Sequence, residues 1–257
     1  RDLKEHNISY TIAPDDYLDN VIDTFFNNII PTNELYKKAI RFLLGKKYSN
    51  YELLNLKRLI KTFINLFKSN YYDISYFLEI LHKIKYTIHI KKYLHNKYLL
   101  LLIINIYNLY NQSLKEENAL DFNDMINESI KNLKSRGLTK KWQYIIVDEY
   151  QDTSLTKFNL LDELIKLSNA KFLAVGDDFQ SIYRFTGCNL NIFLDFSSYF
   201  THSKTFQIVN TYRNPQELIN LAGSFIMKNK KQQRKVLKSH KHLEKPLVIY
   251  YTSDYPK

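Results

Sequence analysis

The sequence contains few of the residues that define several protein classes. One cysteine (Cys188), five glycines and five prolines occur among 257 residues. A single cysteine cannot close an internal disulfide, and so few glycines and prolines exclude a collagen-like chain. The single cysteine also excludes a disulfide-stabilised secreted scaffold, and it favours a reducing, cytoplasmic location.

Long hydrophobic runs are also missing. The longest apolar run covers residues 99–106, with Asn105 inside it, whereas a membrane span needs ~20 residues. No stretch resembles a signal peptide. We therefore expect a soluble, cytoplasmic protein with no membrane partner.

The composition that is present indicates a folded, basic protein. Hydrophobic residues make up 45% of the chain and aromatic residues 15%, which is more than a disordered chain carries. The net charge of +11 favours a polyanionic partner, with nucleic acid first and an acidic membrane surface second. Lysines that only keep an apolar sequence in solution would give the same total.

The charge is distributed unevenly along the chain. It amounts to +5 over residues 1–120, −1 over 121–210 and +7 over 211–257. The middle third is therefore chemically different from its flanks.

A helical pattern covers residues 15–112. Apolar residues recur at spacings of three and four, as in Leu53, Leu56, Ile60, Phe63 and Phe67. Breaks are expected at Pro31, at residues 45–50 and near Asn70, and candidate caps follow them at Thr32, Ser49 or Asn50, and Asp73. The pattern predicts a helical bundle.

The pattern changes to α/β after Asn118. A helix is expected over residues 121–136, and short β-branched runs at 144–147 and 171–175 flank a second helix at 154–167. This spacing predicts a βαβ unit with a parallel sheet, whose strands would be fully buried. Further strands are expected near residues 205–209 and 247–251.

Carboxylates follow both predicted strands. Asp148 and Glu149 end the first, and Asp177 and Asp178 end the second. The carboxyl ends of parallel strands form the ligand crevice of an open sheet, so these acids are expected to converge. One could hold Mg²⁺ while another orients an attacking water, although each could also simply cap a helix.

Three strings of residues occur in order along this part of the chain: VDEYQDTS at 147–154, VGDDFQSIYRFTG at 175–187 and TYRN at 211–214. The first resembles the Walker B, or DExx, box, the second the third motif and the third the fourth motif of the UvrD/Rep-like superfamily 1 DNA helicases, nearest the helicase IV branch. The resemblance covers residues 121–252 and implies a partial RecA-like, P-loop NTPase domain.

The resemblance also implies a division of the chain. Residues 1–115 occupy the place of the helical insertion called domain 1B. Residues 116–210 would then be the second part of RecA-like domain 1A, and residues 211–257 the opening of domain 2A.

The resemblance assigns nucleotide roles to individual residues. Asp148 would bind the Mg²⁺ of ATP, and Glu149 would act as general base. Gln180 would sense the γ-phosphate, and Arg213 would stabilise its developing charge. Tyr212 would stack on the adenine, and Gln151 is a further candidate for nucleotide binding.

DNA contacts are implied for the end of the third motif. Tyr183 and Phe185, with Arg184 between them, resemble residues that bind and stack on single-stranded bases. Period-2 aromatics would also fit the core of a strand. Thr186 departs from the family, because many relatives carry arginine there.

A phosphate-binding loop is missing from these residues. The only Gly-Lys pair, Gly45-Lys46, lacks the first glycine and the Ser/Thr of a P-loop. We therefore expect an internal piece of a longer helicase whose ATP and Mg²⁺ would not bind tightly to the piece alone. A degenerate protein that has lost its P-loop is the alternative.

Two basic runs are candidates for binding the phosphates of single-stranded and duplex DNA, or are simply solvated faces. The first run comprises Lys37, Lys38, Arg41, Lys46, Lys47, Lys57, Arg58, Lys61 and Lys68, interleaved with Tyr36, Tyr48 and Tyr51. The second comprises Lys228, Lys230, Lys231, Arg234, Lys235, Lys238 and Lys241.

The leading hypothesis is part of an ATP-dependent 3′–5′ DNA helicase acting in repair or replication. A non-catalytic single-stranded DNA-binding module or a helicase–nuclease subunit is the first alternative. A metal-dependent nuclease built on the four strand-end acids is the second. The histidines show no zinc spacing, so no structural metal is expected.

Overall fold

The computed structural model describes residues 10–72, 74–87, 90–183, 186–230 and 232–248. These residues fall into two compact units, which are taken separately below. Unit 1 comprises residues 1–146, 154–173 and 183–188, and unit 2 comprises residues 147–153, 174–182 and 189–257. The three-part division suggested by the motifs stays a prediction.

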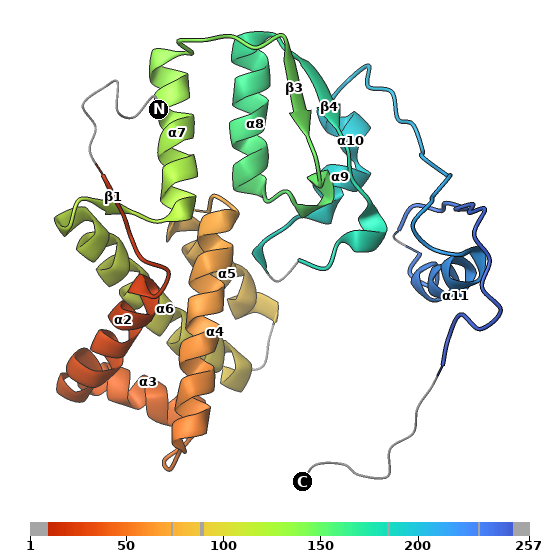
Figure 1. Ribbon diagram of the computed structural model, residues 1–257. Helices are drawn as coiled ribbons and strands as arrows, with labels where there is room; N and C mark the ends of the chain where they lie inside the picture. The colour runs from red at the N-terminus through yellow and green to blue at the C-terminus, as the bar shows by residue number, and fades with distance from the viewer. Residues whose placement is uncertain (1–9, 73, 88–89, 184–185, 231, 249–257) are drawn as a thin grey trace. The chain divides into compact units, whose positions relative to one another are not determined.

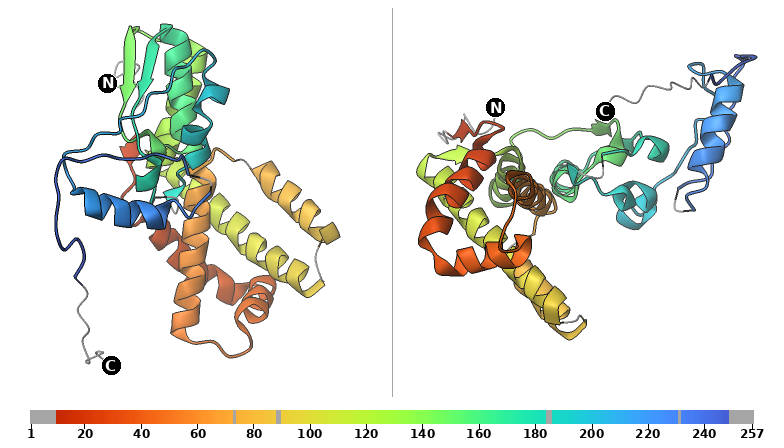
Figure 2. Two further views of the ribbon diagram at one scale, coloured as in Figure 1. Left: turned by 90° about the vertical axis from the view of Figure 1, so that its right-hand side faces the viewer. Right: turned by 90° about the horizontal axis from the view of Figure 1, so that it is seen from below.

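Helices make up the first part of unit 1, as the periodicity predicts (Figure 1). They are α2 (Tyr17–Thr24), α3 (Glu34–Leu44), α4 (Asn50–Ser69), α5 (Ile74–Thr87) and α6 (Ile90–Glu116), with a π-helical turn, Phe25–Ile29, and a 3₁₀ turn, Ile30–Thr32, after α2. Figure 2 shows the length of α6, against which α2, α3, α4 and α5 all pack. None of the helices in the described ranges combines the length and the apolar character that a membrane crossing requires.

Polar side chains set the ends of these helices. Ser49 caps α4 in a capping box, because its hydroxyl accepts the Glu52 N–H while Glu52 accepts the Ser49 N–H. The predicted cap at Thr32 is wrong. Asn33 caps α3 instead, since its carboxamide oxygen reaches the N–H groups of the first turn. Asp73, the third predicted cap, lies outside the described residues.

The core of unit 1 lies among these helices. Ile60 and Ile64 of α4 meet Phe77 of α5 and Ile103 and Ile106 of α6, and all five side chains are essentially inaccessible to solvent. Burying a side chain of this size contributes about 1.5–3 kcal/mol. The apolar residues of α4 that recur at spacings of three and four therefore face the hydrophobic core of unit 1.

A short parallel pair closes the helical part. β1 (Thr11–Ile12) pairs with β2 (Ala119–Leu120), and α7 (Phe122–Arg136) follows at once. Asp121 caps α7 by accepting the Asp124 N–H, and Gly137 ends it with φ +74°. The helix predicted over residues 121–136 is confirmed.

The predicted βαβ unit is present. β3 (Tyr144–Val147) and β4 (Lys171–Ala174) pair, and α8 (Leu155–Ser168) connects them, lying beside α7 in Figure 1. The Lys171 N–H donates to the Gln143 carbonyl, and the Val175 N–H donates to the Val147 carbonyl. Both chain segments therefore advance in the same direction from one bond to the next, which shows that the pair is parallel.

Full burial of these strands was a wrong expectation. Tyr144, Ile146 and Leu173 are each more than half exposed, while the residues that alternate with them are partly buried. A parallel strand becomes apolar throughout when both faces are covered. Within the described residues only one face of this two-stranded sheet is covered.

Unit 2 contains short helical segments around the strand ends. They are the 3₁₀ turns η3 (Tyr150–Asp152) and η4 (Asp178–Gln180) and the helices α9 (Leu190–Leu194), α10 (Phe196–Tyr199) and α11 (Gln216–Ile226). The ring of Tyr150 is buried against Phe193 and Phe196, which holds η3 to α9 and α10.

The third predicted strand, residues 205–209, does not form. A single bridge, Asn210 to Lys238, is found there, and the alternating side chains Phe206 and Ile208 remain more than 80% exposed. Alternation marks a strand only when a partner covers one face, and the described residues contain none here. The strand predicted near 247–251 is absent at residues 247–248, and residues 249–251 lie outside the described part.

Candidate nucleotide site

The end of β3 presents two exposed carboxylates. Asp148 Oδ1 accepts the Glu149 N–H at 2.9 Å, which leaves the other oxygen of Asp148 without a partner among the described residues. Glu149 has left-handed backbone dihedrals, φ +51° and ψ +41°. A non-glycine residue holds this conformation at a cost, and such strain gathers at functional sites.

A glycine allows the two strand ends to approach one another. A Cβ on Gly176 would lie 2.6 Å from Gln151 Oε1 and 2.8 Å from a ring carbon of Phe193. Gln151 fills this space and is almost completely buried. Any larger residue at Gly176 would therefore displace Gln151.

Hydrogen bonds join the DExx string to the third motif through Gln151. Its Nε2 donates to Glu149 Oε2 at 2.8 Å, and its Oε1 accepts the Asp177 N–H at 3.0 Å. Asp177 Oδ2 in turn accepts from Gln180 Nε2 at 2.9 Å. The path Glu149–Gln151–Asp177–Gln180 brings together three residues predicted for the site, with both ends exposed.

Asp177 is the charged centre of this path. Burial would raise the pKa of its carboxyl, but hydrogen bonds from Lys235, Gln180 and the Phe179 N–H outweigh burial, so the pKa of Asp177 lies below its usual value. The carboxylate therefore stays ionised and accepts from Gln180 across the physiological range.

Lys235 is the partner that sequence reasoning missed. Its Nζ pairs with Asp177 and lies 2.8 Å from Asp178 Oδ1. In the sequence, Lys235 is one member of the basic run at residues 228–241 and differs from the other lysines of the run in nothing but its position. No local signal pairs it with acids more than fifty positions earlier.

The same pairing weakens the nuclease hypothesis. Asp177 and Asp178 hold an ammonium group rather than presenting free oxygens, and Asp178 is buried. No group of three or more metal-ligating side chains occurs in the described ranges. The second oxygen of Asp148 is available as one hard oxygen ligand of the kind that Mg²⁺ takes together with waters and phosphates.

The fourth motif lies exposed in unit 2. The Tyr212 ring is 69% exposed and faces His240 with centroids 6.4 Å apart. The exposed Arg213 guanidinium makes no hydrogen bond or ion pair with any described residue. The structure therefore does not connect either side chain to the path that contains Glu149.

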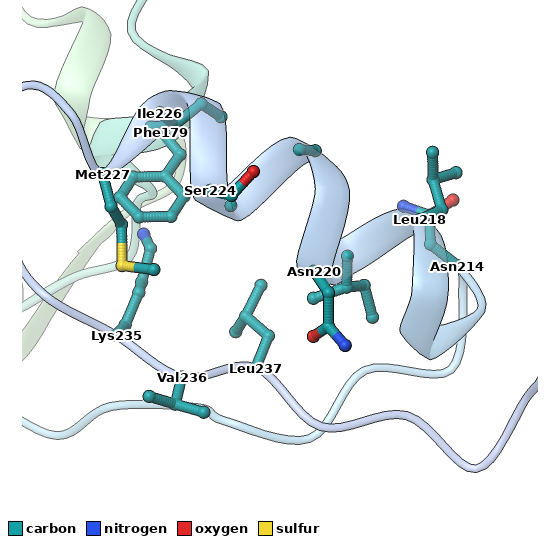
Figure 3. A pocket seen from close by; sticks show the side chains of 13 residues that line it. Phe179, Asn214, Leu218, Asn220, Ser224, Ile226, Met227, Lys235, Val236 and Leu237 are labelled. Carbon is teal, nitrogen blue, oxygen red and sulfur yellow. The ribbon is translucent and has the colours of Figure 1, made fainter. Parts of the chain in front are cut away.

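Within unit 2, α11 and the segment that contains Lys235, Val236 and Leu237 line an open, mainly apolar hollow of about 280 Å³ (Figure 3). Gln216 joins this segment to the start of α11 by accepting the Ser239 N–H. Glu217 accepts from His242 and from the Leu243 N–H, and the His242 contact is the main reason that the pKa of Glu217 falls to about 2.

The proposed DNA-stacking residues are only partly described. Tyr183 is exposed and accepts the Thr186 hydroxyl at its carbonyl, whereas Arg184 and Phe185 lie outside the described residues. Gly187 ends the motif with φ +98°, and a Cβ there would lie 2.1 Å from Ser69 Oγ. The end of α4 therefore packs directly against the end of the third motif.

The first basic run is less available to DNA than its charge indicated. Lys57 and Lys61 pair with Asp23 and Asp19 of α2, and Lys37 pairs with Glu34. The prediction that Lys68 binds DNA is wrong, because its side chain is buried between Asp121 and Asp124 at the start of α7. The exposed members of the run are Lys38, Arg41, Lys46, Lys47 and Arg58, near exposed Tyr48 and Tyr51.

Comparison with known proteins agrees with these motifs. A profile of the UvrD/REP helicase N-terminal domain matches residues 4–201, and the chain therefore belongs to the UvrD/Rep helicase family. It is 36% identical over 137 residues to DNA helicase IV of Escherichia coli, which covers 53% of this chain and 20% of that protein.

Two further relatives match a similar share of this chain and of their own length. ATP-dependent DNA helicase UvrD1 of Mycobacterium tuberculosis is 31% identical over 146 residues, covering 52% of this chain and 19% of the relative. ATP-dependent DNA helicase Rep of Buchnera aphidicola is 34% identical over 128 residues, covering 48% and 19%. The chain spans about a fifth of the length of the curated relatives it matches.

Proposed function

We propose that this chain is part of an ATP-dependent DNA helicase that moves 3′ to 5′ along single-stranded DNA and unwinds duplexes in repair or replication. The hydrogen-bond path from Glu149 to Gln180 is the observation that carries this proposal. It connects an exposed carboxylate at one strand end with an exposed amide in the next motif. Hydrolysis at the first could therefore change the position of the second.

Glu149 is the proposed general base. Its exposed carboxylate accepts from Gln151 at one oxygen, so the other can accept a proton from water. As the water oxygen bonds to the γ-phosphorus, the bond to the β–γ bridging oxygen breaks and the proton passes to Glu149. Asp148 would hold Mg²⁺, which when bound neutralises charge on the phosphate oxygens.

The remaining site residues act on the phosphates and the base. Gln180 would contact the γ-phosphate, Arg213 would stabilise its charge, and Tyr212 would stack on adenine. These 257 residues contain no P-loop sequence, so the proposed activity needs a phosphate-binding lysine that this chain does not supply. The chain alone is therefore expected to hydrolyse ATP negligibly, and robust Mg²⁺-dependent hydrolysis by it would contradict this.

Single-stranded DNA would contact the end of the third motif. The exposed ring of Tyr183 can stack on a base without sequence preference, and Arg184 and Phe185 are the adjoining candidates. The exposed cations of the first basic run would hold phosphates.

Substitution of Glu149 in the full-length protein that carries this chain tests the function. Glu149→Gln should keep ATP and DNA binding but lose turnover by about 10²-fold or more, since a general base contributes 10²–10⁴-fold. The control is Glu244→Gln, at an exposed glutamate away from the path. Wild-type hydrolysis by Glu149→Gln would remove Glu149 from this role.

A further inference from the structure

Lys235 is held on three sides by the start of the third motif. Its ammonium pairs with Asp177 and Asp178 and lies 4.0 Å from the centroid of the Phe179 ring. Its side chain is only 14% exposed. Figure 3 shows Lys235 and Phe179 together at one end of the hollow beside α11. Within the described residues, Lys235 is the only cation paired with either aspartate.

The backbone next to Lys235 supports the same contact. The Gln233 N–H donates to Asp178 Oδ2 at 2.8 Å, and Gln232 Nε2 donates to the Asp178 carbonyl at 3.3 Å. Both Asp178 oxygens are therefore satisfied by residues 233 and 235. A buried carboxylate needs such partners, because removing a charge from water is costly unless it is paired and hydrogen-bonded.

Asp177 divides its two oxygens between Lys235 and the nucleotide site. Oδ1 takes Lys235 and the Phe179 N–H, while Oδ2 takes Gln180. Since a carboxylate is planar, anchoring Oδ1 also fixes the direction of Oδ2. The amide of Gln180 is thus oriented by a lysine that it does not touch.

We propose that Lys235 is a positioning residue, which acts from the segment after the fourth motif to hold Asp177 and thereby orient Gln180 for the γ-phosphate. The role of Gln180 in this statement rests on the proposed function. The contact also couples residues 232–235 to the third motif, so a movement of that segment would change the orientation of Gln180. The ammonium of Lys235 faces inward and takes no part in DNA binding.

Hydrogen exchange in the 257-residue chain tests the contact without any activity. Lys235→Met should raise the exchange rates of the Phe179 and Gln233 amides by about 10-fold or more, because their acceptors lose the cation that holds them. Lys235→Arg should restore most of the protection. Lys245→Met, at an exposed lysine outside both basic runs, is the matched control and should leave these rates unchanged.

Folding is checked in the same experiment. Protection of Ile103 and Ile106 amides in α6 should be equal in all variants, since these residues lie in the core of unit 1. Equal protection of Phe179 and Gln233 in Lys235→Met and wild type would overturn the proposal.

Kinetics of the full-length protein test the positioning role. Lys235→Met should lower kcat for ATP hydrolysis about 10-fold or more with a smaller change in KM, and Lys235→Arg should recover most of the loss. Loss of turnover in Glu149→Gln together with normal turnover in Lys235→Met would refute the Lys235 proposal and leave the function standing. Normal turnover in Glu149→Gln would instead remove the base role on which the proposed function depends.

Discussion

Two lysines, one in each unit, hold pairs of aspartates in similar ways. In unit 1, Lys68 at the end of α4 lies 2.6 Å from Asp121 and 2.7 Å from Asp124, at the start of α7. Its ammonium is also 4.8 Å from the Tyr110 ring centroid, and Tyr110 donates its hydroxyl to Asp121. In unit 2, Lys235 makes the equivalent set of contacts with two acids and a ring.

The surroundings of the two lysines differ. The Lys68 side chain is 3% exposed. Its acidic partners lie at the start of α7, and one of them also accepts from Tyr110 of α6, so the cluster joins α4, α6 and α7. The Lys235 cluster instead shares Asp177 with the exposed amide of Gln180. The same chemistry therefore fixes helix packing in one unit and an exposed functional group in the other.

Removing Lys68 should have the largest effect on stability. Lys68→Met leaves two buried carboxylates without a cation, which should lower the free energy of unfolding by about 3–5 kcal/mol. The control is Lys61→Met, because its pair with Asp19 is more exposed and should contribute only about 0.2–1 kcal/mol. Urea unfolding of both variants measures the difference, and equal losses would show that the Lys68 cluster does not join the helices.

Adding a methyl group at Gly187 should have a smaller effect near the same end of α4. Gly187→Ala would meet Ser69 and would also force φ +98° on a residue with a Cβ, at a cost of about 1–3 kcal/mol. Adding Ser69→Gly removes the contact but not the backbone strain, so it should restore part of the loss. A Gly187→Ala chain as stable as wild type would mean that α4 does not support this part of the motif.

Titration with acid should distinguish the Lys235 cluster from the Lys68 cluster, because an aspartate in each has its pKa shifted in the opposite direction. The pKa of Asp177 is lowered, so its contribution to stability is present above the unfolded pKa and is lost as pH falls through the folded value. Burial, helped by the nearby Asp121 carboxylate, raises the pKa of Asp124, so its contribution has the opposite sign and is lost as pH rises. Carboxyl NMR should show the pKa of Asp177 below that of an ordinary aspartate and the pKa of Asp124 above it. Shifts of both pKa values in the same direction would contradict this difference.

Local signals in the sequence determined much of the fold. The strand at 144–147, the helix over 121–136 and a cap at Ser49 or Asn50 all depend on neighbouring residues; the structure confirms the strand and the helix and shows Ser49 as the cap. The prediction that the strand-end acids converge also depends mainly on the order of elements in a βαβ unit. The strand at 205–209 failed because alternation alone does not supply a partner.

Tertiary structure alone decided what each lysine does. Lys68 and Lys235 both belong to basic runs, and nothing in either run distinguishes them from the exposed lysines around them. Their acidic partners lie 53 to 58 positions away in the sequence. An ion pair over such a separation depends on how helices and loops pack, because burial selects which cations face acids and which face water.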